Sequence, residues 1–271
     1  MKSLSDLLTT IQQGTAAANG LTQVLTNATV NSSSLQVTIS STILAHSSAA
    51  IVAVTKQIFT TSTNYFPTAN MAYCIIECIG GGGGGGGSSG ATNFAIGANG
   101  GGAGGYSKLY ATAAALGSSQ AVTIGAGGAG GAAASGNGSS GGPTSLGSLC
   151  IANGAAGGTG QNSATISTPG IGGTAGTGDF ALPGAAGFSG NYIPAGGSVG
   201  AGIGGQGGYS FYGGGGRGGI GTGSGPPLSL GIAGVGYGSG GGGGATNTST
   251  YSSSGGPGAP GIVIITEFLH G

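Results

Sequence analysis

The segment Tyr73-Cys74-Ile75-Ile76-Glu77-Cys78-Ile79 leads without interruption into eight consecutive glycines, Gly80–Gly87. Its first part is a short apolar run, which is typical of a buried β-strand. Its second part has no side chains, so only backbone N–H, C=O and Cα–H groups can stabilise it. A strand that enters polyglycine is the feature that decides how this chain folds.

Glycine tracts separated by short inserts continue from Gly80 to Gly261. The chain has 271 residues, of which 71 are glycine, whereas glycine usually makes up about 7% of a protein. Such a composition is typical of disorder, but disordered chains combine low hydrophobicity with high net charge. This chain has a mean hydropathy of +0.28 and no net charge. We therefore expect an ordered domain.

Polyproline-II geometry offers these glycines a route to order. It has about three residues per turn and no internal hydrogen bonds, so its amides point outward. Adjacent glycine helices can approach closely because no Cβ intervenes. The tracts follow no strict Gly-X-Y period, which excludes a collagen triple helix. We expect a mainly irregular and β fold class, in which a polyglycine-II helix bundle, or sandwich, is flanked by short β-strands and preceded by a short α-helical N-terminus.

The flanking strands are predicted from alternating or continuous apolar runs. A half-buried strand is expected around Leu35, Val37 and Ile39. Further strands or packing segments are expected at Ile51–Thr55, Gln57–Thr60, Tyr73–Ile79, Tyr106–Tyr110, Ala121–Ile124, Ser148–Ala152 and Gly261–Phe268.

Residues 1–30 have helical rather than strand periodicity. Their apolar residues form two stripes, Leu4/Leu7/Leu8/Ile11 and Leu21/Val24/Leu25. Helices this short are not stable alone, so the stripes need a partner. We expect residues 1–56 to form an attachment or oligomerisation segment and residues 57–271 to form the glycine-rich domain. The alternative is that the two stripes build a small local core.

The scarcity of charge excludes several classes of function. Four Lys/Arg and four Asp/Glu occur in the chain, and the formal net charge is zero. Nucleic-acid-binding proteins carry a basic patch, so we expect no nucleic-acid partner. An enzyme site gathers several titratable groups in one cleft, and this chain has few to gather. We expect no enzyme and no cofactor.

Two motifs that suggest ligands are better explained otherwise. Gly202–Gly207 matches the dinucleotide fingerprint GxGxxG, but no acidic residue follows at the required distance and glycine is abundant enough for chance matches. Cys74 and Cys78 share one face of the predicted strand, where cysteine behaves as a small apolar side chain. Their spacing to Cys150 and the histidines does not suit zinc. We expect no metal site.

The N-terminal residues lack the apolar core of a signal peptide, and no stretch of 18 apolar residues predicts a transmembrane helix. The remaining signal is aromatic. Tyr, Ser and Gly are common in adaptable binding loops, where tyrosine supplies contact area at low entropy cost. We expect a receptor-binding surface among Tyr192, Ile193, Pro194, Tyr209, Phe211, Tyr212 and Arg217. Alternatively, these rings hold the bundle edges together.

The order of motifs along residues 57–268 resembles a known family. Tyr73–Gly87 is followed by Gly101–Ser107, by Val122–Gly128 and by the closing Gly258–Glu267. This order is similar to the glycine-rich domain of bacteriophage tail fibres and tail-tip adhesins. The resemblance implies a polyglycine-II sandwich whose loops bind the host surface, and a place in the virion tail. It implies other tail proteins and a host glycan or outer-membrane protein as partners, and a homo-oligomer, with a trimer expected by analogy.

The composition also fits two other functions. A structural glycine-rich protein of a cell wall or extracellular matrix would need no specific ligand. A depolymerase that cleaves surface glycan would need a pair of carboxylates, and the chain offers only Asp6, Glu77, Asp179 and Glu267.

Overall fold

The computed structural model describes residues 29–30, 37–38, 51–91, 94–163, 165, 167–194, 201–221, 230–247 and 251–271. The chain divides into two compact units, Met1–Ala53 with Leu269–Gly271, and Val54–Phe268. In the first unit, β1 (Thr29–Val30) pairs antiparallel with β2 (Val37–Thr38). The expected N-terminal helices fall outside the described residues, and so do Leu4, Leu7, Leu8, Ile11, Leu21, Val24 and Leu25.

The largest sheet has five strands in the order β12-β8-β5-β20-β3. Its central strand β5 (Met71–Ile79) pairs antiparallel with β8 (Tyr106–Thr112), from Tyr73 opposite Thr112 to Ile79 opposite Tyr106. The apolar face of β5 is completely buried, as is Ile265 of β20. The remaining bounds are β3 (Ile51–Phe59), β12 (Phe180–Leu182) and β20 (Ile262–His270).

A four-stranded sheet has the order β11-β10-β9-β4. Its strands are β4 (Thr63–Tyr65), β9 (Gln120–Thr123), β10 (Thr144–Leu146) and β11 (Cys150–Ala152). Between β8 and β9 lies α4 (Ala113–Leu116), whose N-cap Thr112 accepts a hydrogen bond from the Ala115 amide. Gly117 ends this helix with a φ of +68°, a backbone conformation that glycine adopts readily.

Four smaller sheets join inserts that are distant in sequence. β7 (Phe94–Gly97) lies between β13 (Tyr192–Pro194) and β18 (Ala245–Thr246). The other pairs are β6 (Ser88–Ser89) with β19 (Ser252–Ser253), β14 (Gly202–Ile203) with β16 (Ile220–Gly221), and β15 (Tyr212–Gly214) with β17 (Val235–Tyr237).

The tract Gly80–Gly87 is hydrogen-bonded to neighbours on every side. Its amides donate in rotation to segments 99–105, 136–142 and 256–259, so every third amide meets the same neighbour, at N···O distances of 2.8–3.0 Å. The carbonyls of Gly81–Gly87 accept in the same rotation from segments 128–131, 155–161 and 241–244. All eight glycines are buried. A three-residue repeat of hydrogen bonds thus replaces side-chain packing along this tract.

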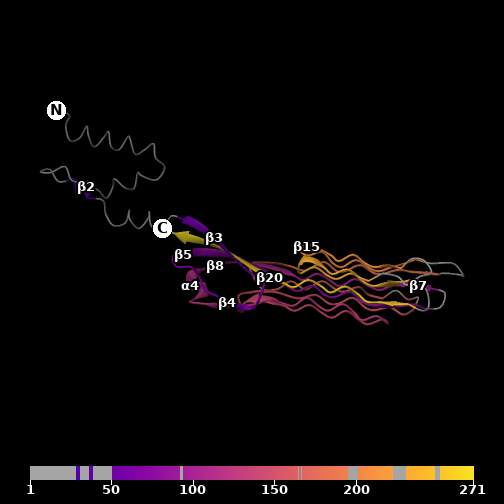
Figure 1. The fold of residues 1–271 in the computed structure, drawn as a ribbon. Helices are drawn as coiled ribbons and strands as arrows, with labels where there is room; N and C mark the ends of the chain where they lie inside the picture. Colours follow the sequence, from indigo (N-terminus) through magenta and orange to yellow (C-terminus); the bar gives the residue numbers. More distant parts are fainter. Residues whose placement is uncertain are drawn as a thin grey trace, which may run out of the picture. The chain divides into compact units, whose positions relative to one another are not determined.

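Two further tracts, 98–105 and 239–244, are enclosed in the same way, and the three enclosed tracts bond to one another. Within the described residues, outer tracts surround them: 125–132, 136–142, 153–161, 170–174, 184–188, 204–208, 216–219, 231–234 and 255–261. In the Val54–Phe268 unit the tracts run side by side from the five-stranded sheet toward the end that carries β7 (Figure 1).

Close approach explains why the enclosed tract is pure glycine. A Cβ at any residue of Gly80–Gly87 would lie 2.0–2.2 Å from a carbonyl oxygen of a neighbouring tract. None of these glycines has a positive φ, so the requirement is for space and not for a left-handed backbone. Outer tracts accept a side chain where it points outward, and Ala126, Ala129 and Ala132 are accordingly exposed.

The structure corrects the fold class expected from the sequence. Regular secondary structure is nearly all β-strand, in many small antiparallel sheets, and α4 is the one helix within the described residues. A mainly irregular polyglycine-II bundle is therefore the wrong fold class for the described residues, and the expected N-terminal helices lie outside them. The physical reason lies in the inserts, because at each tract end the chain returns beside another insert, and strand pairing satisfies the amides of both.

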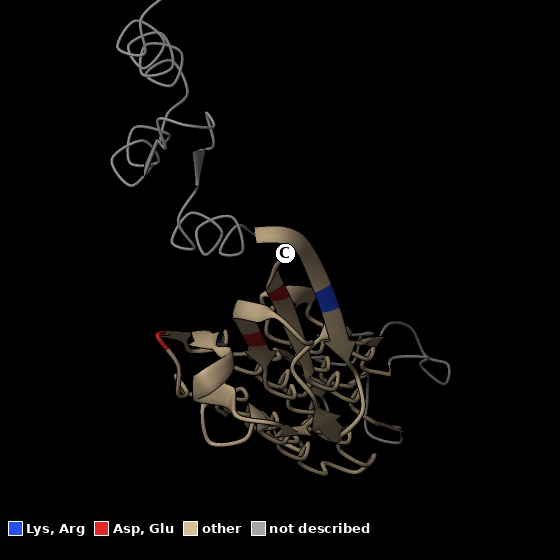
Figure 2. Cartoon of the chain, turned by 90° about the vertical axis from the view of Figure 1, so that its left-hand side faces the viewer, with Lys and Arg blue, Asp and Glu red and all other residues tan. Residues whose placement is uncertain are grey.

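Individual strands were easier to predict. β5, β8, β9, β11 and β20 form at or within two or three residues of the expected bounds, whereas residues 51–59 make the single strand β3 instead of two. Charged residues are few and gather at the sheets: Lys56, Glu77, Lys108 and Glu267 lie on strands of the five-stranded sheet, and the tracts below them carry little colour in Figure 2. No helix in the described part of the chain is long and apolar enough to cross a membrane.

Candidate functional site

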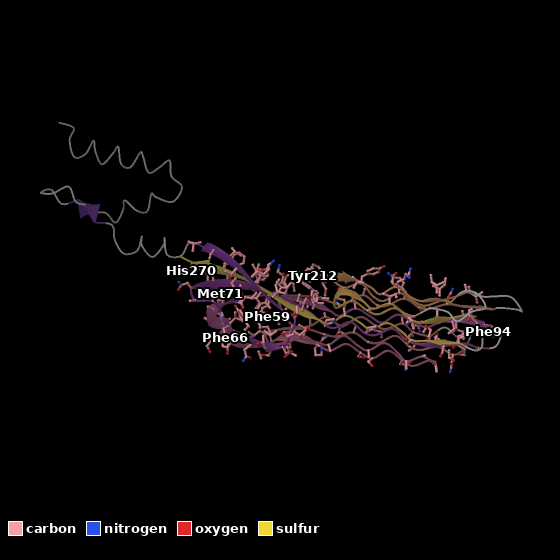
Figure 3. All side chains as sticks on the ribbon, viewed as in Figure 1. Phe59, Phe66, Met71, Phe94, Tyr212 and His270 are labelled. Atoms are coloured by element: carbon pink, nitrogen blue, oxygen red, sulfur yellow. The ribbon has the colours of Figure 1, made fainter. Side chains whose placement is uncertain are left out.

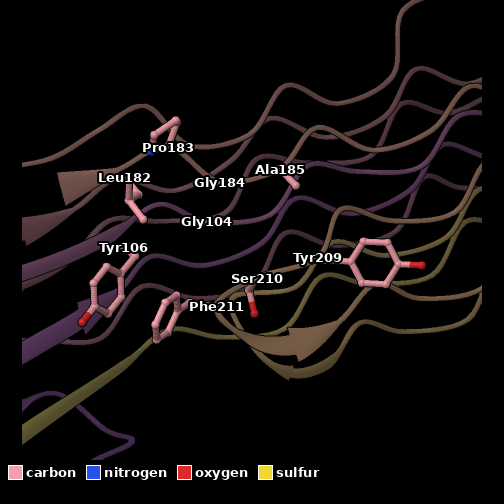
Figure 4. A pocket seen from close by; sticks show the side chains of 9 residues that line it. All are labelled: Gly104, Tyr106, Leu182, Pro183, Gly184, Ala185, Tyr209, Ser210 and Phe211. Carbon is pink, nitrogen blue, oxygen red and sulfur yellow. The ribbon is translucent and has the colours of Figure 1, made fainter.

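A cleft opens where one outer tract ends before its neighbours do. Tract 204–208 stops at Tyr209, and the chain turns so that the Ser210 amide donates to the Gly213 carbonyl at 3.0 Å. The adjacent tract 98–105 continues straight into β8. The resulting cleft has a volume of about 310 Å³ and lies between Leu182–Ala185 and Tyr209–Phe211, with Gly104 and Tyr106 between them (Figure 4).

Stacked rings form one end of the cleft. The rings of Tyr106 and Phe211 lie 4.3 Å apart and nearly parallel, and Phe180 contacts Tyr106 edge-on at 6.4 Å. Tyr106 is only 5% exposed, whereas Phe211 is 58% exposed. Phe211 therefore has one face packed against the protein while much of its surface remains open to a ligand.

Glu77 holds the rings of Tyr106 and Tyr212 through hydrogen bonds to their hydroxyls. Its Oε1 accepts hydrogen bonds from the Tyr106 hydroxyl at 2.6 Å and from the Tyr212 hydroxyl at 3.0 Å. Burial and the neighbouring Glu77 raise the pKa of Tyr212 to about 12, and the same causes raise the pKa of Tyr106 further. Both hydroxyls are therefore protonated donors at neutral pH. Ser210 adds a hydrogen bond to the Tyr237 carbonyl, which holds the turn against β17.

The structure separates the residues predicted to bind a receptor. Tyr209 and Phe211 line the cleft, and Tyr212 lies beside it through its bond to Glu77. Tyr192, Ile193 and Pro194 form β13, which pairs with β7. The ring of Tyr192 there meets the ring of Phe94 at 6.4 Å. Figure 3 places Phe94 and Tyr212 far apart along the unit.

Arg217 belongs to neither group. It is exposed on outer tract 216–219, where its carbonyl accepts from the Ile232 amide at 2.9 Å, and it does not line the cleft.

Sequence reasoning missed half of the cleft. The sequence places Tyr106 in a predicted strand or packing segment, and it marks neither Leu182 nor Pro183 as a site residue. A signal was available, because Phe180-Ala181-Leu182-Pro183 is a short apolar insert between glycines. Its antiparallel pairing with β8, which places Leu182 opposite Tyr106, depends on the path of the intervening tracts.

Glu267 forms a second polar cluster, inside the sheet region. Glu267, at the C-terminal end of the unit in β20, is completely buried. It accepts hydrogen bonds from the Tyr65 hydroxyl at 2.7 Å, from the Thr68 amide and hydroxyl at 3.0 and 2.6 Å, and from Thr55 and Gln57. Burial alone would raise the pKa of Glu267, but the bonds from Thr68, Tyr65 and Thr55 outweigh it and lower the pKa to about 2.

Cys74, Cys78 and Cys150 are buried and free, and the burial of Cys74 and Cys78 agrees with their place on one face of the predicted strand. Cys78 lies near Cys150, and its thiol is 3.7 Å from the Cys150 carbonyl. The hydrogen bond with Cys150 and burial raise the pKa of the Cys78 thiol. Within the described residues, no group of three or more His, Cys, Asp or Glu could hold a metal ion.

Comparison with known proteins assigns the family. A comparison with curated protein sequences finds no match. Residues 58–267 match the family model described as a glycine-rich domain, a range that includes the enclosed tracts, the inserts and the cleft. The chain therefore belongs to the glycine-rich domain family.

Proposed function

We propose that this protein is a tail fibre or receptor-binding adhesin of a bacteriophage, a non-enzymatic component of the virion tail that binds the host cell surface. The order of motifs from Tyr73 to Glu267 supports this proposal through its similarity to tail adhesins. Membership of the glycine-rich domain family is consistent with it.

The observation that carries the proposal is the contrast between the bundle interior and its surface. The enclosed tracts use their amides on one another and on the outer tracts, so recognition falls to outward side chains and inserts. Large apolar side chains are exposed there, namely Ile171, Phe188, Ile203, Tyr209, Phe211, Ile220, Ile232 and Val235. Exposed apolar patches often mark contact surfaces.

Attachment of the protein to the particle is assigned to residues 1–56. Their apolar stripes, Leu4/Leu7/Leu8/Ile11 and Leu21/Val24/Leu25, supply the physical motive. Other tail proteins, or further copies of the chain in a trimer, are the proposed partners of this segment.

Adsorption of the purified full chain to intact bacteria tests the proposal. Fluorescently labelled protein should bind a subset of strains saturably, and an excess of unlabelled protein should compete. Mass spectrometry of purified virions from the source should detect the chain. Absence from virions, together with recovery in a cell-wall or matrix fraction, would favour a structural protein without a specific ligand.

A further inference from the structure

We infer that the cleft between Leu182–Ala185 and Tyr209–Phe211 binds a single neutral sugar ring, a pyranose residue of a surface glycan. This inference rests on the proposed function, because it names the chemical class of the receptor. It concerns a site near the five-stranded sheet, distinct from the β13–β7 end of the unit.

The Gly104 carbonyl is a hydrogen-bond acceptor without a backbone donor among the described residues, and it forms the polar side of the cleft. The carbonyls of Ala98 and Gly101 accept from the amides of Gly205 and Gly208, both at 2.8 Å. The three-residue repeat makes Gly104 the next acceptor and residue 211 the next donor. The chain has turned away at Tyr209, and no backbone amide of the described residues donates to the Gly104 carbonyl.

The position of this carbonyl follows from the same repeat. A Cβ built on Gly187 would lie 2.7 Å from the Gly101 oxygen, and a Cβ built on Gly184 would lie 2.6 Å from the Gly104 oxygen. The two oxygens therefore occupy equivalent places against tract 184–188. Gly101 meets a tract amide on its other side, whereas Gly104 meets the cleft. A backbone carbonyl without a protein partner needs another donor, and the hydroxyl of a ligand can supply it.

Aromatic and aliphatic surfaces form the other sides. Phe211 is 58% exposed and Tyr209 is 49% exposed, and Leu182 is also open. The face of an aromatic ring carries partial negative charge and attracts C–H groups, which carry weak partial positive charge. A pyranose has such C–H groups on its faces and hydroxyl donors on its edge, so it can stack on Phe211 while donating to the Gly104 carbonyl.

The charge and the volume of the cleft narrow the choice of ligand further. No Lys, Arg, Asp or Glu lines the cleft, and the Tyr106 hydroxyl is already bonded to Glu77, so an anionic or cationic sugar gains nothing. The volume of about 310 Å³ is at the small end for ligand pockets. It suits one ring, such as a terminal or branching residue, better than an extended peptide.

The test uses the full chain with methyl glycosides of glucose, galactose and mannose, observed by saturation-transfer NMR. At least one glycoside should bind the wild-type protein. Phe211→Ala removes the stacking wall, and Ala185→Trp fills the cleft from an exposed position without removing a ring. Each should weaken binding by about tenfold or more. Phe66→Ala, which removes a ring 63% exposed outside the cleft, should bind as the wild type does.

Several outcomes would overturn the inference. They are failure of all three glycosides to bind the wild type, unchanged binding in Ala185→Trp, and occupation of the cleft by a proline-rich peptide but by no sugar. Circular dichroism of each variant shows whether it is folded, and Ala185→Trp keeps the test valid if Phe211→Ala unfolds.

Cell adsorption measured in parallel separates this inference from the proposed function. If wild type and both cleft variants adsorb equally to bacteria, the sugar site is wrong and the adhesin stands. If the wild type binds a glycoside but adsorbs to no cell tested, the sugar site stands and the adhesin is wrong.

Discussion

At the scale of single residues, glycine has two different structural roles in this protein, one steric and one conformational. In Gly80–Gly87 it removes a Cβ that would collide with a neighbouring carbonyl, while φ stays in the range open to any residue. At Gly117 the situation is reversed: nothing lies within 4 Å of an added Cβ, but φ is +68°. The two roles predict different responses to the same substitution.

Gly84→Ala should destabilise the domain severely. The new Cβ would lie 2.0 Å from the Ala129 carbonyl oxygen, and neither tract can move without breaking its own hydrogen bonds. Overpacking of interiors commonly costs about 1–3 kcal/mol, and a backbone clash on this scale should exceed that range. Thermal unfolding and soluble yield measure the effect. Ala129→Val, at an exposed position of the adjacent tract, is the matched control and should be close to neutral. A Gly84→Ala protein as stable as this control would contradict the close-packed arrangement.

Glu267 should make the domain sensitive to acid. Its folded-state pKa of about 2 lies below that of an unfolded glutamate, about 4.3. Its contribution is therefore complete above about pH 4.5 and is lost as the pH falls toward 2. A shift of this size corresponds to about 2–3 kcal/mol.

Glu267→Gln should lower the unfolding temperature at neutral pH and flatten its dependence on pH between about 4.5 and 2. Thermal melts of both proteins across that range provide the measurement. Parallel pH curves for the variant and the wild type would show that the hydrogen bonds to Glu267 do not depend on its charge.

At the scale of elements, the protein alternates tracts with inserts, and α4 shows how an insert ends. Gly117 has φ +68° and ψ −156°, a region that is essentially restricted to glycine. Gly117→Ala should therefore cost about 1–3 kcal/mol through backbone strain alone. Denaturant unfolding measures this cost, with the exposed Ser118→Ala as control. A difference below a few tenths of a kcal/mol would mean that the chain relaxes around this position.

The sequence predicts where strands lie along the chain better than it predicts which elements lie next to each other. β5 and β20 are dense apolar runs beside glycine, so periodicity alone locates them. Glycine at 80–87 also predicts backbone packing, because nothing else is available to pack. Which tract lies beside which is set by the long path of the chain, and that path decides that Leu182 meets Tyr106. The cleft could not be predicted for this reason, although Tyr209, Phe211 and Tyr212 could be selected as exposed aromatic candidates.

At the scale of the whole domain, a hydrogen-bonded backbone interior supports a surface made of inserts and outward side chains. If the protein is an adhesin, Tyr212→Ala should weaken adsorption to host cells, because Tyr212 holds the Tyr209–Phe211 turn through Glu77. A hot-spot contact is worth about 2 kcal/mol, or roughly a thirtyfold change in affinity.

Arg217→Ala tests a separate surface, since Arg217 lies outside the cleft. Cell-binding isotherms with folded variants measure both. Unchanged adsorption in both would remove these residues from the receptor surface, and loss of folding would make them structural.

The three enclosed glycine tracts should form the most stable part of the domain. Hydrogen–deuterium exchange of the full chain, read by NMR or by mass spectrometry of short peptides, tests it most directly. Amides of 80–87, 98–105 and 239–244 should exchange slowest, with protection approaching that of global unfolding. The exposed turn at Tyr209–Phe211 should exchange much faster. Rapid exchange throughout Gly80–Gly87, at rates close to those of the turn, would contradict the account.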